Sequence, residues 1–213
     1  MDYQQILDSI LEIRDDIYKD LENDQLFKVK KKLDQIRELA DDIIEEDDQQ
    51  KIIDKISVYE FLADLYNECG RLKISTDCYG KCIDLSKKII DENREEYDPI
   101  RDYYRHYIAN RYLLEGNTSE DLNDELYEYL DEDGLNLRET TIEYYSTALK
   151  HDPVEDSEEY LAIFDEVDEK LYDALNMKRA EDDYLEQYRL LKKKILHDDY
   201  GIEWKDPFEY NEE

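Results

Sequence analysis

The sequence predicts an all-α protein, and three observations support this prediction. Glycine and proline are scarce, with 5 and 3 residues in a chain of 213, so few positions interrupt a helix. Apolar residues recur at steps of three and four along most of the chain, which is the spacing of an amphipathic helix. No segment alternates apolar and polar residues as a half-buried strand does.

The apolar spacing predicts about nine helices, with approximate ranges 3–21, 26–43, 52–69, 72–90, 100–114, 116–134, 136–151, 157–175 and 178–197. A polar segment at 45–50 separates the second helix from the third. Gly70 and Gly116 are expected to end helices, because glycine most easily adopts the left-handed cap conformation. Ser119 can cap the short helix that follows, and Gly134 is expected to close it.

Short links between successive helices predict antiparallel helix pairs. We expect one helical-repeat domain over 1–199, with the helix at about 116–134 as an insertion, and an acidic, aromatic tail over 200–213. The tail can act as a cap that packs Trp204 and Phe208 over the exposed end of the array. Alternatively, it offers Trp204 and Tyr210 to a partner as anchors.

Residues 56–89 carry a pattern of aromatic and small side chains spread over two helices. The residues that form it are Tyr59, Leu62, Ala63, Tyr66, Gly70, Leu72, Ser75, Tyr79 and Cys82. This pattern resembles the tetratricopeptide repeat (TPR), with Tyr for Trp, Ala for Gly, Ser for Ala, and Lys87 in place of the closing proline. Weaker units at 100–151 and 160–195 extend the resemblance to about two thirds of the chain. The resemblance implies a short TPR-like array of stacked helix pairs.

The chain is strongly acidic. Its 60 acidic residues against 28 Lys and Arg give a net charge of −32, which repels nucleic acid and anionic membranes and favours basic partners. The segment from Glu115 to Glu169 holds 20 of the acids and only Arg138 and Lys150 as bases, a net charge of −18. The sequence therefore predicts one strongly negative face.

We expect a non-enzymatic interaction protein that presents this acidic helical face to a basic partner protein, with a nucleic-acid-binding protein as a candidate. The residues predicted to contact the partner are Glu120, Asp121, Asp124, Glu125, Glu128, Asp131, Glu132, Asp133, Glu155, Asp156, Glu158 and Glu159, with Trp204 and Phe208 of the tail. The alternative is that these acidic side chains are solvated on the helix surfaces and bind no partner.

A sharper alternative is mimicry of DNA. Acidic residues at positions i and i+4 of a helix have Cβ atoms about 6 Å apart, which is the order of the phosphate spacing along a nucleic-acid strand. A rigid array of them can fill a basic groove and inhibit a nucleic-acid-binding enzyme, as anti-CRISPR and anti-restriction proteins do.

A third hypothesis rests on Arg101 and His106. Their spacing, R-x₄-H, is similar to the motif of the HEPN ribonucleases, which are all-helical. The resemblance implies His106 as general acid or base and Arg101 as the group that stabilises phosphate charge. We favour the interpretation of His106 as a polar residue on a repeat helix, because a surface with a net charge of −32 repels RNA.

The cysteines and the apolar segments indicate whether to expect a metal site, which compartment the protein occupies and whether it contacts a membrane. Cys78 and Cys82 share one helix face, but zinc needs four ligands, so we expect buried core cysteines and neither a metal nor a cofactor. An odd count of three cysteines fits a reducing compartment. No basic-then-apolar leader and no apolar run of roughly 18 residues are present, which predicts a cytoplasmic protein without membrane contact.

Overall fold

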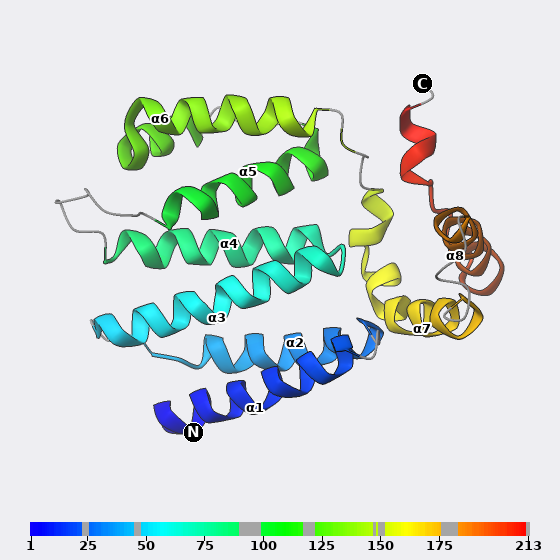
Figure 1. Cartoon of the computed structure of the whole chain (residues 1–213), viewed down its shortest axis with the longest axis horizontal. Helices are drawn as coiled ribbons and strands as arrows, with labels where there is room; N and C mark the ends of the chain where they lie inside the picture. The colour runs from blue at the N-terminus through cyan, green and yellow to red at the C-terminus, as the bar shows by residue number, and fades with distance from the viewer. Residues whose placement is uncertain are drawn as a thin grey trace. The chain divides into compact units, whose positions relative to one another are not determined.

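The computed structural model describes residues 1–22, 26–44, 48–89, 99–116, 122–146, 148, 152–175 and 183–211. Within these ranges it holds eight α-helices, two short 3₁₀ helices and no strand, so the all-α prediction is confirmed for the described part of the chain (Figure 1). The elements are α1 (Tyr3–Glu22), α2 (Leu26–Asp41), α3 (Gln49–Glu68), α4 (Leu72–Lys87), α5 (Ile100–Glu115), α6 (Leu122–Tyr145), η1 (Pro153–Asp156), α7 (Glu158–Leu175), α8 (Tyr184–Tyr200) and η3 (Pro207–Asn211).

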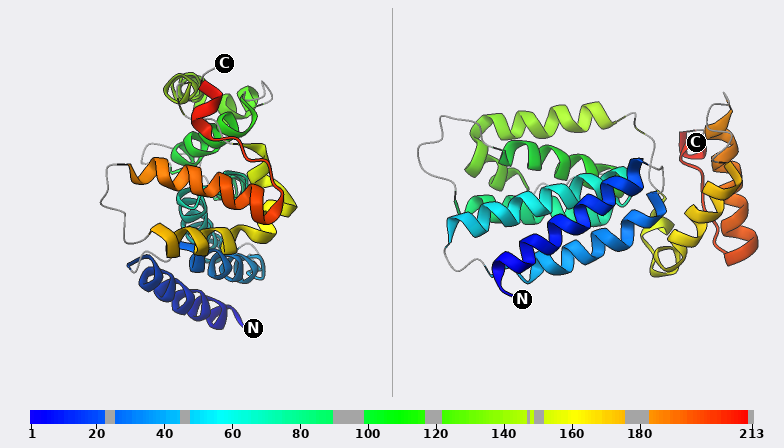
Figure 2. Two further views of the ribbon diagram at one scale, coloured as in Figure 1. Left: turned by 90° about the vertical axis from the view of Figure 1, so that its right-hand side faces the viewer. Right: turned by 60° about the horizontal axis from the view of Figure 1, so that its bottom comes forward.

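The chain divides into two compact units. Unit 1 comprises Met1–Arg14 and Leu33–Ala148, and unit 2 comprises Asp15–Lys32 and Leu149–Glu213. The division cuts through α1 and α2. These two helices lie side by side in the views of Figures 1 and 2. The proposed extent of a single domain over 1–199, with a tail from 200, remains a prediction.

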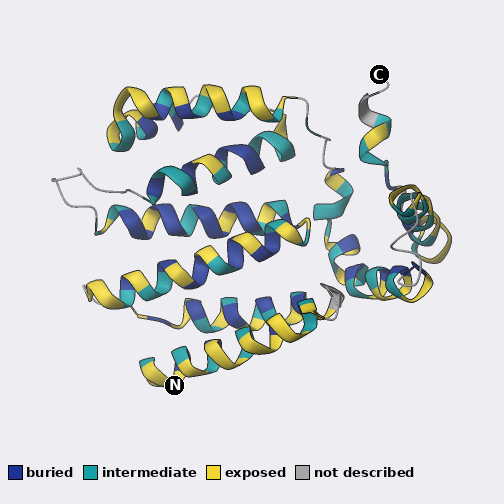
Figure 3. Cartoon of the chain, viewed as in Figure 1, coloured by how far each residue is buried: buried dark blue, intermediate teal, exposed yellow. Residues whose placement is uncertain are grey.

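In unit 1, α3 to α6 pack in sequence order, each against the next. Because α4 lies between α3 and α5, it is buried on two sides, whereas much of α6 is exposed (Figure 3). Ser75 of α4 illustrates this position. Its hydroxyl donates to the Ala63 carbonyl of α3 at 2.8 Å and accepts from the Asn110 amide of α5 at 3.0 Å. A small polar residue therefore joins three helices at the centre of the unit.

The segment that resembles a TPR is a packing motif in the structure. Gly70 has φ 72° and follows the end of α3, which confirms it as a helix stop. Cys78 and Cys82 are buried, and burial raises the pKa of the Cys78 thiol to about 12. The Cys82 thiol donates to the Ile56 carbonyl at 3.7 Å. These two thiols are therefore core groups with little thiolate character.

Tyrosine hydroxyls tie neighbouring helices together. Several tyrosines donate their hydroxyl to a carboxylate on another helix, and all of them except Tyr3 are buried; the pairs in unit 1 are Tyr3–Asp54, Tyr59–Asp41, Tyr66–Asp34, Tyr79–Asp64 and Tyr104–Glu125. Burial and then the adjacent carboxylate raise the tyrosine pKa values. Phenylalanine would fill the same space but leave the carboxylate without this donor, which favours tyrosine at these positions.

The helix boundaries predicted around Gly134 are wrong. The helices expected at 116–134 and 136–151 are the two halves of α6, and the break falls at Asp131, with φ 55° and ψ −145°. Gly134 lies within α6 and is buried, because the backbone folds back on itself at this point: a Cβ there would lie 2.5 Å from the Leu126 carbonyl oxygen. Ser119, the expected cap, lies outside the described residues.

In unit 2, α7 and α8 pack together and enclose a core that includes the tail. The buried residues of this core are Tyr160, Phe164, Val167, Leu171, Leu175, Leu196 and Trp204. The Trp204 indole donates to Glu155 at 2.6 Å, and the Lys205 amide donates to Asp152 at 2.6 Å. Residues 204 and 205 are thereby fixed to η1 and its N-cap, the segment that precedes α7.

Candidate interaction surface

The outer side of α6 carries most of the predicted acidic residues of unit 1. Leu122 and Leu126 of the first half and Leu137 of the second half are buried, so each half of α6 turns one side toward the core. The exposed residues of α6 are Asp124, Tyr127, Glu128, Asp131, Glu132, Asp133, Asn136, Glu139, Thr140, Glu143 and Tyr144. Five of the predicted contact residues are in this set. Two others, Glu120 and Asp121, lie outside the described residues.

Glu125 differs from its acidic neighbours because it is a tertiary contact. Its carboxylate accepts from Lys87 of α4 at 2.7 Å and from the Tyr104 hydroxyl of α5 at 2.6 Å. The Lys87 ammonium also lies 5.1 Å from the centre of the Tyr129 ring. This half-buried cluster fastens the first half of α6 to α4 and α5, so Glu125 is occupied within the chain.

This cluster predicts a loss of stability in acid. Burial alone would raise the pKa of Glu125, but hydrogen bonds from Lys87 and Tyr104 outweigh it and lower the pKa below the ordinary 4.5. A carboxylate with a lowered pKa in the folded state stabilises the fold above the unfolded value, and this stabilisation disappears as the pH falls through the folded value. We expect the urea midpoint, followed by circular dichroism, to fall below about pH 4.5.

Glu125→Gln is the matched variant for this prediction. The amide still accepts hydrogen bonds but carries no charge, so we expect a loss of about 1 kcal/mol at pH 7. The variant should also show a shallower fall of the urea midpoint between pH 5 and about 3 than the natural chain. Identical pH profiles for the two chains would show that Glu125 does not contribute in this way.

The predicted acidic residues of unit 2 divide into two groups. Glu158 and Glu159 are exposed in the first turn of α7, where negative charge is favoured by the helix dipole. Glu155 is mostly enclosed, since it accepts from Trp204 and pairs with Lys192 at 3.2 Å. Asp156 is partly buried in η1. The residues predicted to form one face therefore belong to both units, and Glu155 has a structural role.

The two aromatic residues predicted in the tail have different environments. Trp204 is 4% exposed and lies in the core of unit 2, with the Lys192 ammonium 4.6 Å from its ring. Phe208 is 49% exposed, and the Arg189 guanidinium lies 3.9 Å from its ring centre. Trp204 is thus engaged in the core of unit 2, while Phe208 is about half exposed, and the cap interpretation stays a prediction.

Arg101 and His106 each have a structural contact in unit 1. The Arg101 guanidinium lies 3.7 Å from the Asp133 carboxylate of α6. The His106 ring stacks on the buried Tyr79 ring, with centres 5.0 Å apart and planes at 9°. The ribonuclease hypothesis remains a prediction, and these contacts supply an alternative reason for both residues.

Two exposed tyrosines of α6 are absent from the sequence-based list of contact residues. Tyr127 is 55% exposed beside the exposed Glu128, and Tyr144 is 77% exposed and lines a pocket with Arg105, Thr140 and Thr141. The signal for Tyr127 was present, because it falls outside the stripe formed by Leu122, Leu126 and Leu130. Tyrosine is enriched at the energetic centres of protein interfaces, so these residues belong with the candidate surface.

The described residues show neither a candidate metal site nor a membrane-spanning helix. In the part of the chain that the structure describes, no group of three or more His, Cys, Asp or Glu side chains could hold a metal ion. None of the described helices combines the length and apolar character needed to cross a membrane.

Comparisons with known proteins identify no relative. Neither a protein-family model nor a curated protein nor a solved structure matches this chain. The TPR-like character of the fold therefore stays a prediction from the residues at 56–89.

Proposed function

We propose that the protein is a non-enzymatic interaction module and that the outer side of α6 binds a basic surface of a partner protein. The observation that supports this most directly is the composition of that side. Its described exposed residues include seven carboxylates and two tyrosines, and the helix contains Arg138 as its single basic residue. Such a surface attracts cations at long range and offers aromatic rings at contact.

The chain itself illustrates how such a surface can hold a lysine. Lys87 pairs with Glu125 at 2.7 Å while lying over the Tyr129 ring, and Lys81 pairs with Asp41 at 2.6 Å while lying 4.5 Å from the centre of the Tyr59 ring. A carboxylate and a tyrosine together thus form a site for an ammonium group. On the outer side of α6, the exposed Tyr127 lies one residue from Glu128 and three from Asp124, so a ring and carboxylates are both available there.

Charge reversal of exposed α6 residues tests this function. We expect Asp124→Lys, Glu128→Lys and Glu132→Lys together to reduce partner capture at least tenfold in a pull-down from cell lysate with the tagged full chain. These three side chains are exposed, so the fold should persist, as judged by circular dichroism. The captured proteins should also be released by high salt, because exposed charges are screened.

The matched control carries the same change in net charge at other places. Glu12, Glu68 and Asp173 are exposed on α1, α3 and α7. If Glu12→Lys, Glu68→Lys and Asp173→Lys together reduce capture as much as the α6 variant, general acidity rather than α6 governs binding, and the proposal is wrong.

Added duplex DNA separates the two forms of this function. A partner that DNA displaces from the chain is a nucleic-acid-binding protein whose groove α6 fills, which is the DNA-mimic alternative. A partner that DNA leaves in place indicates an ordinary docking module. His106→Ala is informative for the ribonuclease alternative alone, since only that alternative predicts a loss of RNA cleavage.

A further inference from the structure

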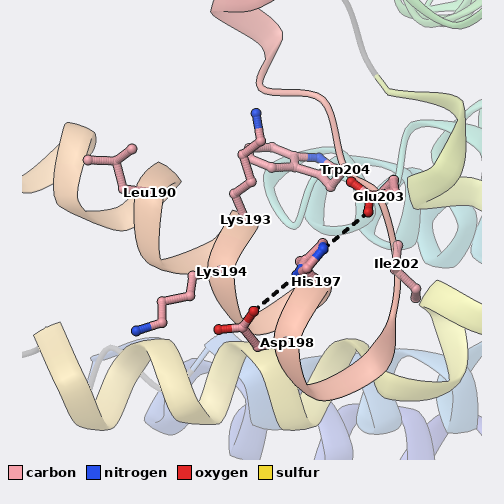
Figure 4. Close-up of a pocket in the computed structure, with 8 residues that line it drawn as sticks. All are labelled: Leu190, Lys193, Lys194, His197, Asp198, Ile202, Glu203 and Trp204. Carbon is pink, nitrogen blue, oxygen red and sulfur yellow. Dashed lines mark hydrogen bonds and ion pairs between the residues drawn. The ribbon is translucent and has the colours of Figure 1, made fainter.

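A second surface of the protein has the opposite chemistry and lies in unit 2. A pocket of about 260 Å³ opens between α8 and the segment that follows it (Figure 4). Its lining residues are Leu190, Lys193, Lys194, His197, Asp198, Ile202, Glu203 and Trp204. Leu190, Lys193, Lys194 and His197 follow one another at helical spacing and form one wall, while Ile202, Glu203 and Trp204 form the other.

The helical wall is basic in an otherwise acidic protein. Its two lysines, Lys193 and Lys194, lie within a stretch of α8 that has no acid between Glu186 and Asp198. Lys194 is exposed and forms no ion pair with any described residue. Both walls also contribute apolar atoms, since Leu190 is 63% exposed and Trp204 is among the lining residues.

The two carboxylates of the lining are engaged with histidine. Asp198 lies 3.0 Å from Nδ1 of His197, and Glu203 lies 3.3 Å from Nε2 (Figure 4). The hydrogen bond between His197 and Asp198, and then the charge of Glu203, raise the pKa of His197. Lys194 is then the positively charged side chain of the lining that can pair with a carboxylate of a bound molecule.

The tail of the same chain shows which chemistry this side of α8 accepts. Asp206 pairs with Arg189 at 3.1 Å, Phe208 lies under the same guanidinium, and Glu209 pairs with Lys193 at 2.6 Å. An aromatic side chain flanked by two acids is therefore bound along α8, next to the pocket.

We propose that this pocket is a docking site for an acidic segment of a partner protein. The segment inserts a large apolar side chain between Leu190 and the Ile202–Trp204 wall, and its neighbouring carboxylate pairs with Lys194. The argument is charge complementarity together with the arrangement of residues 206–209, which bind the adjacent turn of α8 through the same groups. This site is separate from α6 and selects the opposite charge.

A defined peptide tests the proposal. The probe is a synthetic peptide of sequence Asp-Pro-Phe-Glu-Tyr with an amino-terminal fluorescein, titrated with the full chain and followed by fluorescence anisotropy. We expect saturable binding that weakens at least tenfold in Lys194→Glu and several-fold in Leu190→Ala. Replacing Phe by Ala in the peptide, or both acids by Lys, should abolish saturation.

Lys73→Glu is the matched control, because Lys73 is exposed on α4 and its reversal changes net charge equally. Its affinity for the probe should equal that of the natural chain. Absence of saturable binding, or equal weakening in Lys194→Glu and Lys73→Glu, overturns the proposal. The α6 charge-reversal variant should not weaken probe binding, so failure at one surface leaves the other testable.

Discussion

Replacing Trp204 with alanine is expected to lower the stability of unit 2 by about 3–5 kcal/mol, the cost of removing a large buried aromatic side chain. The indole is 4% exposed and packs within the core of α7 and α8. Its removal leaves a cavity among Tyr160, Phe164 and Leu196. It also removes the hydrogen bond to Glu155, whose carboxylate then depends on Lys192.

Hydrogen exchange followed by mass spectrometry locates this effect. Amides of α7 and α8 should exchange much faster in Trp204→Ala, whereas those of α3 and α4 in unit 1 should be unchanged. Because Trp204 is the only tryptophan of the chain, its fluorescence also reports the same core in the natural protein. We expect emission typical of a buried indole, shifting to the red as unit 2 unfolds.

Trp204→Phe provides the control for the alanine variant. Phenylalanine keeps most of the packing and loses the indole donor, so we expect a loss of about 1–2 kcal/mol. A loss below about 1 kcal/mol for Trp204→Ala would show that the tail is not part of the core of unit 2.

Replacing Gly134 with alanine is expected to destabilise unit 1 by about 1–3 kcal/mol, although alanine is the better helix former. The added Cβ would lie 2.5 Å from the Leu126 carbonyl oxygen and 3.0 Å from the Leu130 Cβ. Backbone atoms cannot move aside as a flexible side chain can, so the two halves of α6 must separate. Urea unfolding followed by circular dichroism measures the loss.

Asp131→Gly should act in the opposite direction at the same bend. Asp131 holds φ 55° and ψ −145°, a conformation that costs a residue with a side chain about 1–3 kcal/mol. Glycine adopts it freely but loses more entropy on folding, so we expect a net gain of about 1 kcal/mol. A stabilised Gly134→Ala together with a destabilised Asp131→Gly would contradict the fold of α6 described above.

The helical parts of the fold could be predicted because their signals are local. The approximate ranges of α1 to α5, α7 and α8 follow from apolar spacing, and Gly70 marks the end of the third helix in both the sequence and the structure. The bend in α6 could not be predicted in the same way. Asp131 has no local preference for its conformation, which is imposed by the packing of Gly134 against Leu126.

The sequence predicted which acidic residues the candidate surface contains, but not which of them are exposed. Acidic residues at 115–169 are evident from the sequence, yet Glu125 and Asp124 look alike there. Only the positions of Lys87 and Tyr104, from two other helices, show that Glu125 is an internal contact while Asp124 remains exposed. The pocket beside α8 likewise depends on where the chain returns after Gly201.

The sequence by itself determined the helical class, the strong negative charge and the burial of the cysteine-bearing helix face, because spacing and composition act locally or as sums over the chain. The tertiary structure decided which carboxylates face outward, where α6 bends, and that Trp204 belongs to a core. These properties depend on contacts between residues far apart in sequence, such as Glu155 with Trp204, and no local pattern specifies them.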